Sequence, residues 1–473
     1  MATKTMQLDE TGHRKFGLRD KLAYGAGDFG CNMSFALKGT LTIYWTQFMG
    51  INQMLMAGLL LLVQVWDAIN DPLIGAIVDA DRHQYKRNKF LVYITVGAIG
   101  LTFAGALCFV PLPGAPAMVK NILFVAGYVI WDAFYTVANV PYGSMLPLIS
   151  NDPVQRAQLS TFRSAGSMIA GVLTGILIPI LIYDSDSNLL GDRLFVIALI
   201  MGVLGLAFFM FMIKNTEIRV DTHIDLSEEP PKFNILKAMF NFMRNRPAVG
   251  ATLAAVSTFI GMYGAQTATQ ITFQAYFNMA KISGIAGMIS YLGMFFFMPF
   301  IGKIVTRFGK KEAVTVGSIV TVAAYVLMLV LPITPDMKGL GLFMLCQVLA
   351  AIGNGFGTCV GYAMMGDAMD YEEWKFGERN EGTTYALHSF FRKLAQGVGP
   401  SLGIILATFL GYNAVLGPDQ PMDVALNMRY LTAAMYLLGA LLQVLSYGVI
   451  YNLDKKTLAE MEHDLKERHA AKG

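Results

Sequence analysis

The chain has 473 residues, of which 55% are hydrophobic and 15% are charged, and its formal net charge is +3. Soluble domains carry roughly 25% charged residues, so the composition excludes an ordinary soluble domain. The small net charge gives no reason to expect a nucleic-acid partner. Apolar blocks without internal charge, such as 195–213 and 431–449, are long enough to cross the hydrocarbon core of a membrane as helices.

Hydropathy predicts an all-α membrane protein with twelve transmembrane helices. These are expected near 22–48, 54–78, 90–112, 118–145, 159–183, 193–213, 248–277, 283–302, 312–333, 339–366, 382–411 and 427–451. Lys and Arg concentrate in the loops after the second, sixth and eighth helices and in the tail. Because basic residues mark the cytoplasmic side, we expect a multi-pass protein of the bacterial inner membrane with both termini in the cytoplasm.

The longest polar stretch between helices divides the chain in the middle. We therefore predict an N-terminal six-helix bundle over 1–213, a central cytoplasmic loop over 214–246, a C-terminal six-helix bundle over 247–452 and a cytoplasmic tail over 453–473. A glycine followed by a basic turn recurs after the second and eighth helices, which favours an internal repeat of the kind found in secondary transporters. The alternative is that cytoplasmic turns are generally basic.

The second predicted span contains Asp67, Asn70 and Asp71, which are spaced i, i+3, i+4 and so share one helix face. Ionisable side chains at bilayer depth are costly unless they face a cavity or a partner. Two carboxylates one turn apart repel each other until a cation or a proton neutralises one of them. The pattern predicts a site for Na⁺ or H⁺, and the alternative is a structural cluster paired with a basic residue of another helix.

The fourth predicted span has a similar polar face made by Asp132, Tyr135, Thr136 and Asn139. The Thr136 hydroxyl is a neutral oxygen suited to completing a cation site, although a helix–helix hydrogen bond is an equal alternative. Other spans also carry polar side chains. These side chains are Asp28, Asn32 and Lys38 in the first span, Arg163 in the fifth, and His388 and Lys393 in the eleventh.

Further acidic residues follow the tenth predicted span, between Asp367 and Glu381. We expect them to form a solvated cytoplasmic turn. The sequence shows no glycine-rich phosphate loop with Lys-Ser/Thr and no His/Cys cluster. An enzyme, a cofactor and ATP-driven pumping are therefore not expected, and an ion gradient is the expected energy source.

The sequence resembles the glycoside–pentoside–hexuronide:cation symporters, the melibiose permease family of the major facilitator superfamily. The motifs that carry this resemblance are Tyr24-Gly25-x-Gly27-Asp28, Trp66-Asp67-Ala68-Ile69-Asn70-Asp71-Pro72, Asn139-Val140-Pro141-Tyr142-Gly143-Ser144, Asp370-Tyr371-Glu372-Glu373-Trp374 and Arg392-Lys393. The resemblance implies a coupling-cation site at Asp67, Asn70, Asp71 and Thr136. It implies sugar-binding positions at Asp28, Asn32, Tyr135, Asn139, Arg163, His388 and Lys393.

The chain departs from the melibiose-transporting members of the family at two of these positions and at Gly143. Those members carry acids where this chain has Asn32 and Asn139, and a tryptophan where it has Gly143. These departures argue against an α-galactoside substrate. Because Arg163 and Lys393 are retained, the resemblance suggests an anionic sugar such as a hexuronide, and Lys38 could reinforce that preference.

The expected function is import of a sugar, glycoside or hexuronide by alternating access, coupled to Na⁺ or H⁺. The expected partners are the substrate, the monovalent cation and the lipid bilayer, and the protein is expected to be a monomer. The alternatives are a lipid-type or non-coupled transporter of the same fold, and a membrane sugar sensor.

Overall fold

The computed structural model describes the chain except for residues 1–13, 82, 84, 86–87, 151, 220–234, 378–380 and 473. Within the described residues the structure is largely helical, and an isolated β-bridge joins Tyr183 to Leu189. The chain divides into two compact units. The first comprises Met1–Ile51, Val65–Asp184 and Leu189–Glu229, and the second comprises Asn52–Gln64, Ser185–Asn188 and Pro230–Gly473.

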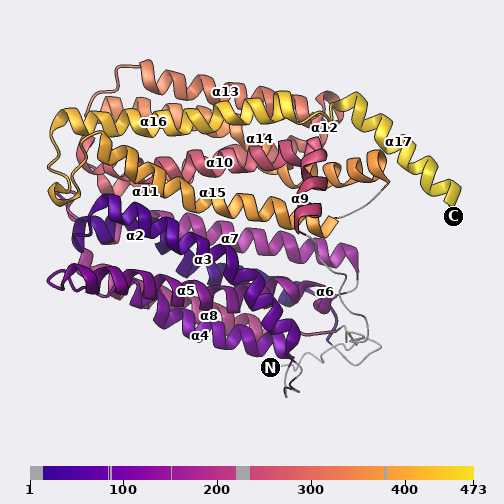
Figure 1. Ribbon diagram of the computed structural model, residues 1–473, viewed down its shortest axis with the longest axis horizontal. Helices are drawn as coiled ribbons and strands as arrows, with labels where there is room; N and C mark the ends of the chain where they lie inside the picture. The colour runs from indigo at the N-terminus through magenta and orange to yellow at the C-terminus, as the bar shows by residue number, and fades with distance from the viewer. Residues whose placement is uncertain are drawn as a thin grey trace, which may run out of the picture. The chain divides into compact units, whose positions relative to one another are not determined.

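The first unit is built from long helices and short connecting turns. They are α1 (Leu18–Phe35), a 3₁₀ turn (Ala36–Thr40), α2 (Leu41–Ile43), a π-helical turn (Tyr44–Phe48), α3 (Gln53–Ala80), α4 (Lys89–Leu107), α5 (Ala117–Ser144), α6 (Leu146–Ile149), α7 (Pro153–Ile182) and α8 (Gly191–Asn215). The first turns of α3 belong to the second unit. Helix α1 packs against α7 and α8. Helix α4 packs against α5 and α8 (Figure 1).

The second unit follows the same plan. Its elements are α9 (Ile235–Arg244), α10 (Arg246–Ile271), a π-helical turn (Thr272–Tyr276), a 3₁₀ turn (Ala280–Ile282), α11 (Ser283–Phe297), a 3₁₀ turn (Met298–Phe300), α12 (Ile301–Phe308), α13 (Lys310–Val330), α14 (Met337–Phe376), α15 (Glu381–Phe409), a 3₁₀ turn (Ala414–Leu416), α16 (Met422–Leu445), a π-helical turn (Ser446–Ile450) and α17 (Lys455–Lys472). Helix α10 packs against α15 and α16, and α14 packs against α11 and α13.

Ten of the described helical segments are long and apolar enough to cross a membrane, so the chain is a multi-pass membrane protein. Each of the ten coincides with one of the expected spans. The two expected spans outside this group, near 22–48 and 382–411, are also helical. Polar residues are frequent in both, including Asp28 and Lys38 in the first and Arg392 and Lys393 in the second.

The acidic segment after the tenth expected span is helical from Asp367 to Phe376, so the expectation of a solvated turn is wrong for this part, while Glu378 and Arg379 lie outside the described residues. Helix α14 runs for 40 residues. It begins where the Asp336 side chain accepts the N–H of Gly339, a bond that holds the pKa of Asp336 below its usual value. It ends at Gly377, whose φ of 69° suits glycine. Glu372 is only 3% exposed, and it accepts the Thr384 hydroxyl at 3.1 Å.

Helices α1 and α7 touch through glycine backbones. A Cβ atom placed on Gly166 would lie 2.1 Å from the carbonyl oxygen of Gly25, whereas one on Gly175 of the same helix would meet nothing within 4 Å. Only glycine therefore fits at position 166, and the close contact sets the distance between the two helices.

Gly166→Ala is therefore expected to destabilise the protein, because overpacking costs about 1–3 kcal/mol. We expect its melting temperature in detergent to fall by about 3 °C. Gly175→Ala is the matched control, and it should be neutral or stabilising because alanine favours helix by about 1 kcal/mol over glycine. Equal melting temperatures for the two variants would contradict the packing argument.

Candidate functional site

A buried polar cluster joins α3 to α5 within the first unit. The Asn70 amide group donates to the Thr136 hydroxyl at 2.8 Å, to the Asp132 carboxylate at 2.9 Å and to the Asp132 carbonyl at 3.0 Å. The Thr136 hydroxyl in turn donates to the Asp71 carboxylate at 3.0 Å. Asn70 is 0%, Thr136 1% and Asp67 7% exposed, so the cluster is screened from solvent.

One atom of this cluster lacks a partner. The side-chain oxygen of Asn70 is buried and accepts no hydrogen bond, although the amide nitrogen is fully used. Leaving a buried acceptor unpaired is costly, and such atoms call for an explanation such as a bound ion. Amide, hydroxyl and carboxylate oxygens are the ligands that hard cations prefer. The donor set therefore fits a small cation, with a proton on a carboxylate as the other way to neutralise it.

Asp132 and Lys38 also belong to this cluster, and the sequence did not assign them to it. Asp132 lies one turn before Thr136 on α5, and its carboxyl interacts with both Asn70 and Asp67. The Lys38 ammonium lies 3.5 Å from the Asp67 carboxylate. The helical spacing of Asp132 and Thr136 could have assigned Asp132 to the cluster. The pairing of Lys38 crosses between helices, and spacing along the chain does not reveal it.

Among the described residues, no group of three or more His, Cys, Asp and Glu side chains is arranged to hold a metal ion. The oxygens of the cluster come instead from a mixture of residue types. These are the carboxylates of Asp67, Asp71 and Asp132, the amide of Asn70 and the hydroxyl of Thr136.

A second polar cluster joins α1 to α7. The Arg163 guanidinium donates to the Asp28 carboxylate at 3.1 Å, and it lies 4.8 Å from the ring centre of Tyr142. The Asn32 amide donates to the Asp28 carbonyl at 2.8 Å and to the Ser167 hydroxyl at 3.0 Å. The structure thus brings together three of the expected sugar-binding residues. Side-chain exposure is 34% for Arg163 and 12% for Asp28, so the pair is partly accessible.

Two further expected sugar-binding residues extend this region along α5 toward α1. The Tyr135 ring lies 5.6 Å from the ring of Phe35 and 5.7 Å from that of Trp131. The Asn139 side-chain oxygen accepts a long contact of 3.8 Å from the Cys31 thiol. Tyr135 directly precedes Thr136, so one helix carries residues of both clusters.

The remaining two expected sugar-binding residues, His388 and Lys393, lie on α15 in the second unit. His388 is 6% exposed, and its Nδ1 lies 3.0 Å from the Thr252 hydroxyl of α10. Lys393 is half-buried, and its carbonyl accepts the Gln64 amide at 3.2 Å. Their membership of a sugar site stays a prediction.

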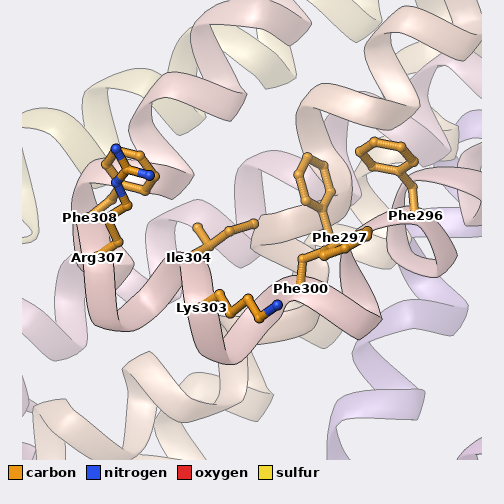
Figure 2. A pocket seen from close by; sticks show the side chains of 7 residues that line it. All are labelled: Phe296, Phe297, Phe300, Lys303, Ile304, Arg307 and Phe308. Carbon is orange, nitrogen blue, oxygen red and sulfur yellow. The ribbon is translucent and has the colours of Figure 1, made fainter.

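An open groove of about 340 Å³ lies at the junction of α11 and α12, and it does not resemble a sugar site (Figure 2). It is lined by Phe296, Phe297, Phe300, Lys303, Ile304, Arg307 and Phe308, with no carboxylate or amide among them. Figure 2 shows Arg307 beside Phe308, at 5.2 Å from its ring centre, while Lys303 extends toward Phe300. The two cations do not converge on one point.

Long apolar helices and a buried acid cluster define a membrane transporter. The chain matches the family model described as "MFS/sugar transport protein" over residues 23–455. It belongs to this family of sugar transporters in the major facilitator superfamily, so it is a transporter and not an enzyme. The resemblance drawn from the motifs is confirmed.

Similar proteins agree with this family. The chain is 29% identical to "Uncharacterized symporter YjmB" of Bacillus subtilis, over 99% of each chain. It is 26% identical to "Glucuronide carrier protein homolog" of Escherichia coli, over 90% of this chain and 92% of the relative. A solved bacterial homologue of the lysosomal transporter Spinster is similar in fold, with a TM-score of 0.61 and 16% identity over 92% of this chain and 96% of that one.

Proposed function

We propose that the protein is a cation-coupled symporter that imports a sugar or glycoside by alternating access. In this proposal it is a monomer of twelve transmembrane helices in the bacterial inner membrane, and both termini lie in the cytoplasm. The observation that carries the proposal is the buried network of Asn70, Thr136 and Asp71, with an unpaired oxygen on Asn70. Such a network is costly without a positive charge to complete it.

The proposed cation site consists of Asp67, Asn70, Asp71 and Thr136, and Na⁺ is the favoured ion because neutral oxygens accompany the acids. H⁺ is the alternative. A bound cation relieves the repulsion between the acids and orders α3 against α5. Since Tyr135 and Thr136 are consecutive on α5, ordering one cluster affects the other. Coupling of this kind is reciprocal, so the sugar also tightens binding of the cation.

The proposed sugar site of the first unit consists of Asp28, Asn32, Tyr135, Asn139 and Arg163. His388 and Lys393 of the second unit are proposed as further substrate-binding residues. A carboxylate, a guanidinium, amides and an aromatic ring are the groups that bind sugar hydroxyls and sugar faces. The first candidate substrate is a neutral glycoside, because Arg163 and Lys38 already pair with acids. A hexuronide is the second candidate, favoured by the similarity to the glucuronide carrier homologue.

Ligand-induced thermal stabilisation of the purified protein tests this function. A panel of glycosides and hexuronides is measured in NaCl and in choline chloride at equal ionic strength. We expect one sugar class to raise the melting temperature more in Na⁺ than in choline, and the same sugars to support counterflow in proteoliposomes. Stabilisation without counterflow would favour a sensor, and stabilisation by lipids alone would favour a lipid-type transporter. Equal effects in both salts, with no dependence on a pH gradient, would contradict coupling.

A further inference from the structure

Lys38 lies where a charged side chain would be costly without a partner. It belongs to the 3₁₀ turn that follows α1, and its ammonium lies 3.5 Å from the Asp67 carboxylate. The exposed fractions of the two side chains are 21% and 11%. An ammonium at membrane depth needs an acid, an aromatic surface or water. Asp67, a residue of the proposed cation site, supplies that acid.

In the same position, the Lys38 ammonium also lies against three aromatic rings. The Lys38 ammonium lies 5.3 Å from the ring centre of Tyr128, 5.6 Å from that of Phe35 and 6.0 Å from that of Trp131. These distances are within the range of cation–π attraction, about 6 Å. We call these three rings the aromatic box. Lys38 can therefore move away from Asp67 and keep a favourable partner.

A small cavity gives the side chain room for such a movement. The cavity has a volume of about 10 Å³, and Lys38, Ser34 and Trp131 are among the residues that line it. The Ser34 hydroxyl accepts the indole N–H of Trp131 at 2.7 Å, so a polar oxygen is already present at its wall. A cavity of this size is at the lower limit for a single water molecule, so it permits only a small shift of the ammonium group.

The charges of the cluster leave Lys38 in competition with any ion that binds there. Asp67, Asp71 and Asp132 supply up to three negative charges, and Lys38 supplies one positive charge. A cation that uses Asp67 must displace the ammonium from that carboxylate. The unpaired Asn70 oxygen lies in the same cluster. It accepts no hydrogen bond from Lys38 in the observed arrangement, but it can act as a ligand for a smaller ion.

We propose that Lys38 is a tethered counter-ion that pairs with Asp67 when the coupling cation is absent. When Na⁺ binds, the ammonium leaves that carboxylate and shifts further toward the rings of the aromatic box, which it already contacts. This inference rests on the proposed function, because it concerns the same cation site. The tethered ammonium keeps the acid cluster partly neutral in the empty transporter. It also lowers the affinity for Na⁺, because part of the free energy of ion binding displaces the ammonium. Lys38 is thus a residue that sets ion affinity.

The test is a Na⁺ titration of the full-length protein, followed by thermal stability at constant ionic strength. Lys38→Met removes the competing charge, so the half-saturating Na⁺ concentration is expected to fall by roughly tenfold. Lys120→Met is the matched control. Lys120 also lies in the first unit, but its ammonium donates to the Met49 carbonyl at 2.6 Å. This control should stay within about twofold of the wild type, because distant sites act independently.

Trp131 provides a second readout that does not depend on a lysine variant. Moving the ammonium toward its ring should change the tryptophan emission of the wild-type protein on addition of Na⁺. Trp131→Phe should remove most of that change while Na⁺-dependent stabilisation persists. A Na⁺-responsive wild type whose emission does not change would overturn the inference.

The outcomes separate this inference from the proposed function. If the wild type responds to Na⁺ and Lys38→Met binds Na⁺ equally well or more weakly, the tethered counter-ion is wrong and symport stands. If the wild type ignores Na⁺ but accumulates sugar along a pH gradient, the inference is also wrong and H⁺ coupling stands. If neither cation affects sugar binding or accumulation, the proposed function fails as well.

Discussion

Asp71→Asn is expected to abolish uphill accumulation of sugar while leaving sugar exchange measurable. The Asp71 carboxylate accepts the Thr136 hydroxyl at 3.0 Å, and an asparagine oxygen can accept the same bond. The variant therefore keeps the local packing and loses only the negative charge that a cation must neutralise. Without cation coupling, the ratio of internal to external sugar should fall to about one, since no gradient drives the sugar.

Proteoliposomes provide the two measurements. Accumulation is followed in sugar-free vesicles under an imposed Na⁺ gradient, and counterflow is followed without a gradient in vesicles preloaded with sugar. Asp423→Asn is a suitable control, because Asp423 is an exposed acid in the first turn of α16. It should accumulate sugar as the wild type does. Undiminished accumulation by Asp71→Asn would remove this residue from the cation site.

Asp28→Asn should produce the second large effect, on sugar affinity and on the preference for substrate charge. Asp28 pairs with Arg163 at 3.1 Å. Breaking the pair leaves a partly buried guanidinium without its acid. The free-energy cost is expected to be about 1–2 kcal/mol, because Arg163 stays one-third exposed. A neutral sugar that uses this carboxylate should bind roughly tenfold more weakly. The unpaired Arg163 should then favour an anionic sugar, so affinity for a hexuronide should fall less or rise.

Isothermal titration with a matched glucoside and glucuronide measures this change in preference. A double-mutant cycle with Arg163→Gln separates the pair itself from the single substitutions, since the two residues are in contact. Asp192→Asn, at the exposed start of α8, is the control for loss of one acid. Equal losses for the two sugars would show that Asp28 supports the site without selecting charge.

The sequence identified the acid pair and its immediate neighbours because helical spacing is regular. Asn70 lies on the face shared by Asp67 and Asp71, and in the structure its amide reaches Thr136 on the next polar helix. Ten of the expected spans also coincide with helices that are long and apolar enough to cross a membrane, since long apolar blocks have few other stable forms there. Local periodicity was enough for these features.

Contacts between helices could not be derived in the same way. The sequence treated Lys38 and Arg163 as charges available to an anionic sugar, whereas the structure pairs them with Asp67 and Asp28. Neither partner lies within one turn of its cation, so no spacing rule relates them. The prediction of a solvated turn after residue 366 was wrong for a related reason. Its charges suggested solvent, but α15 supplies the Thr384 hydroxyl that helps to bury Glu372.

Helix α14 is longer than a membrane is thick. At about 1.5 Å per residue, its 40 residues extend about 60 Å, compared with about 40–45 Å for a bilayer with its headgroups. Its last turns must stand clear of the lipid, where the Trp374 indole donates to Asp464 of α17 at 2.8 Å. A small tilt within the bilayer is therefore magnified at this end, and α17 moves with it. A spin label near Phe376 would therefore report the tilt of α14 during each transport cycle from a position outside the lipid.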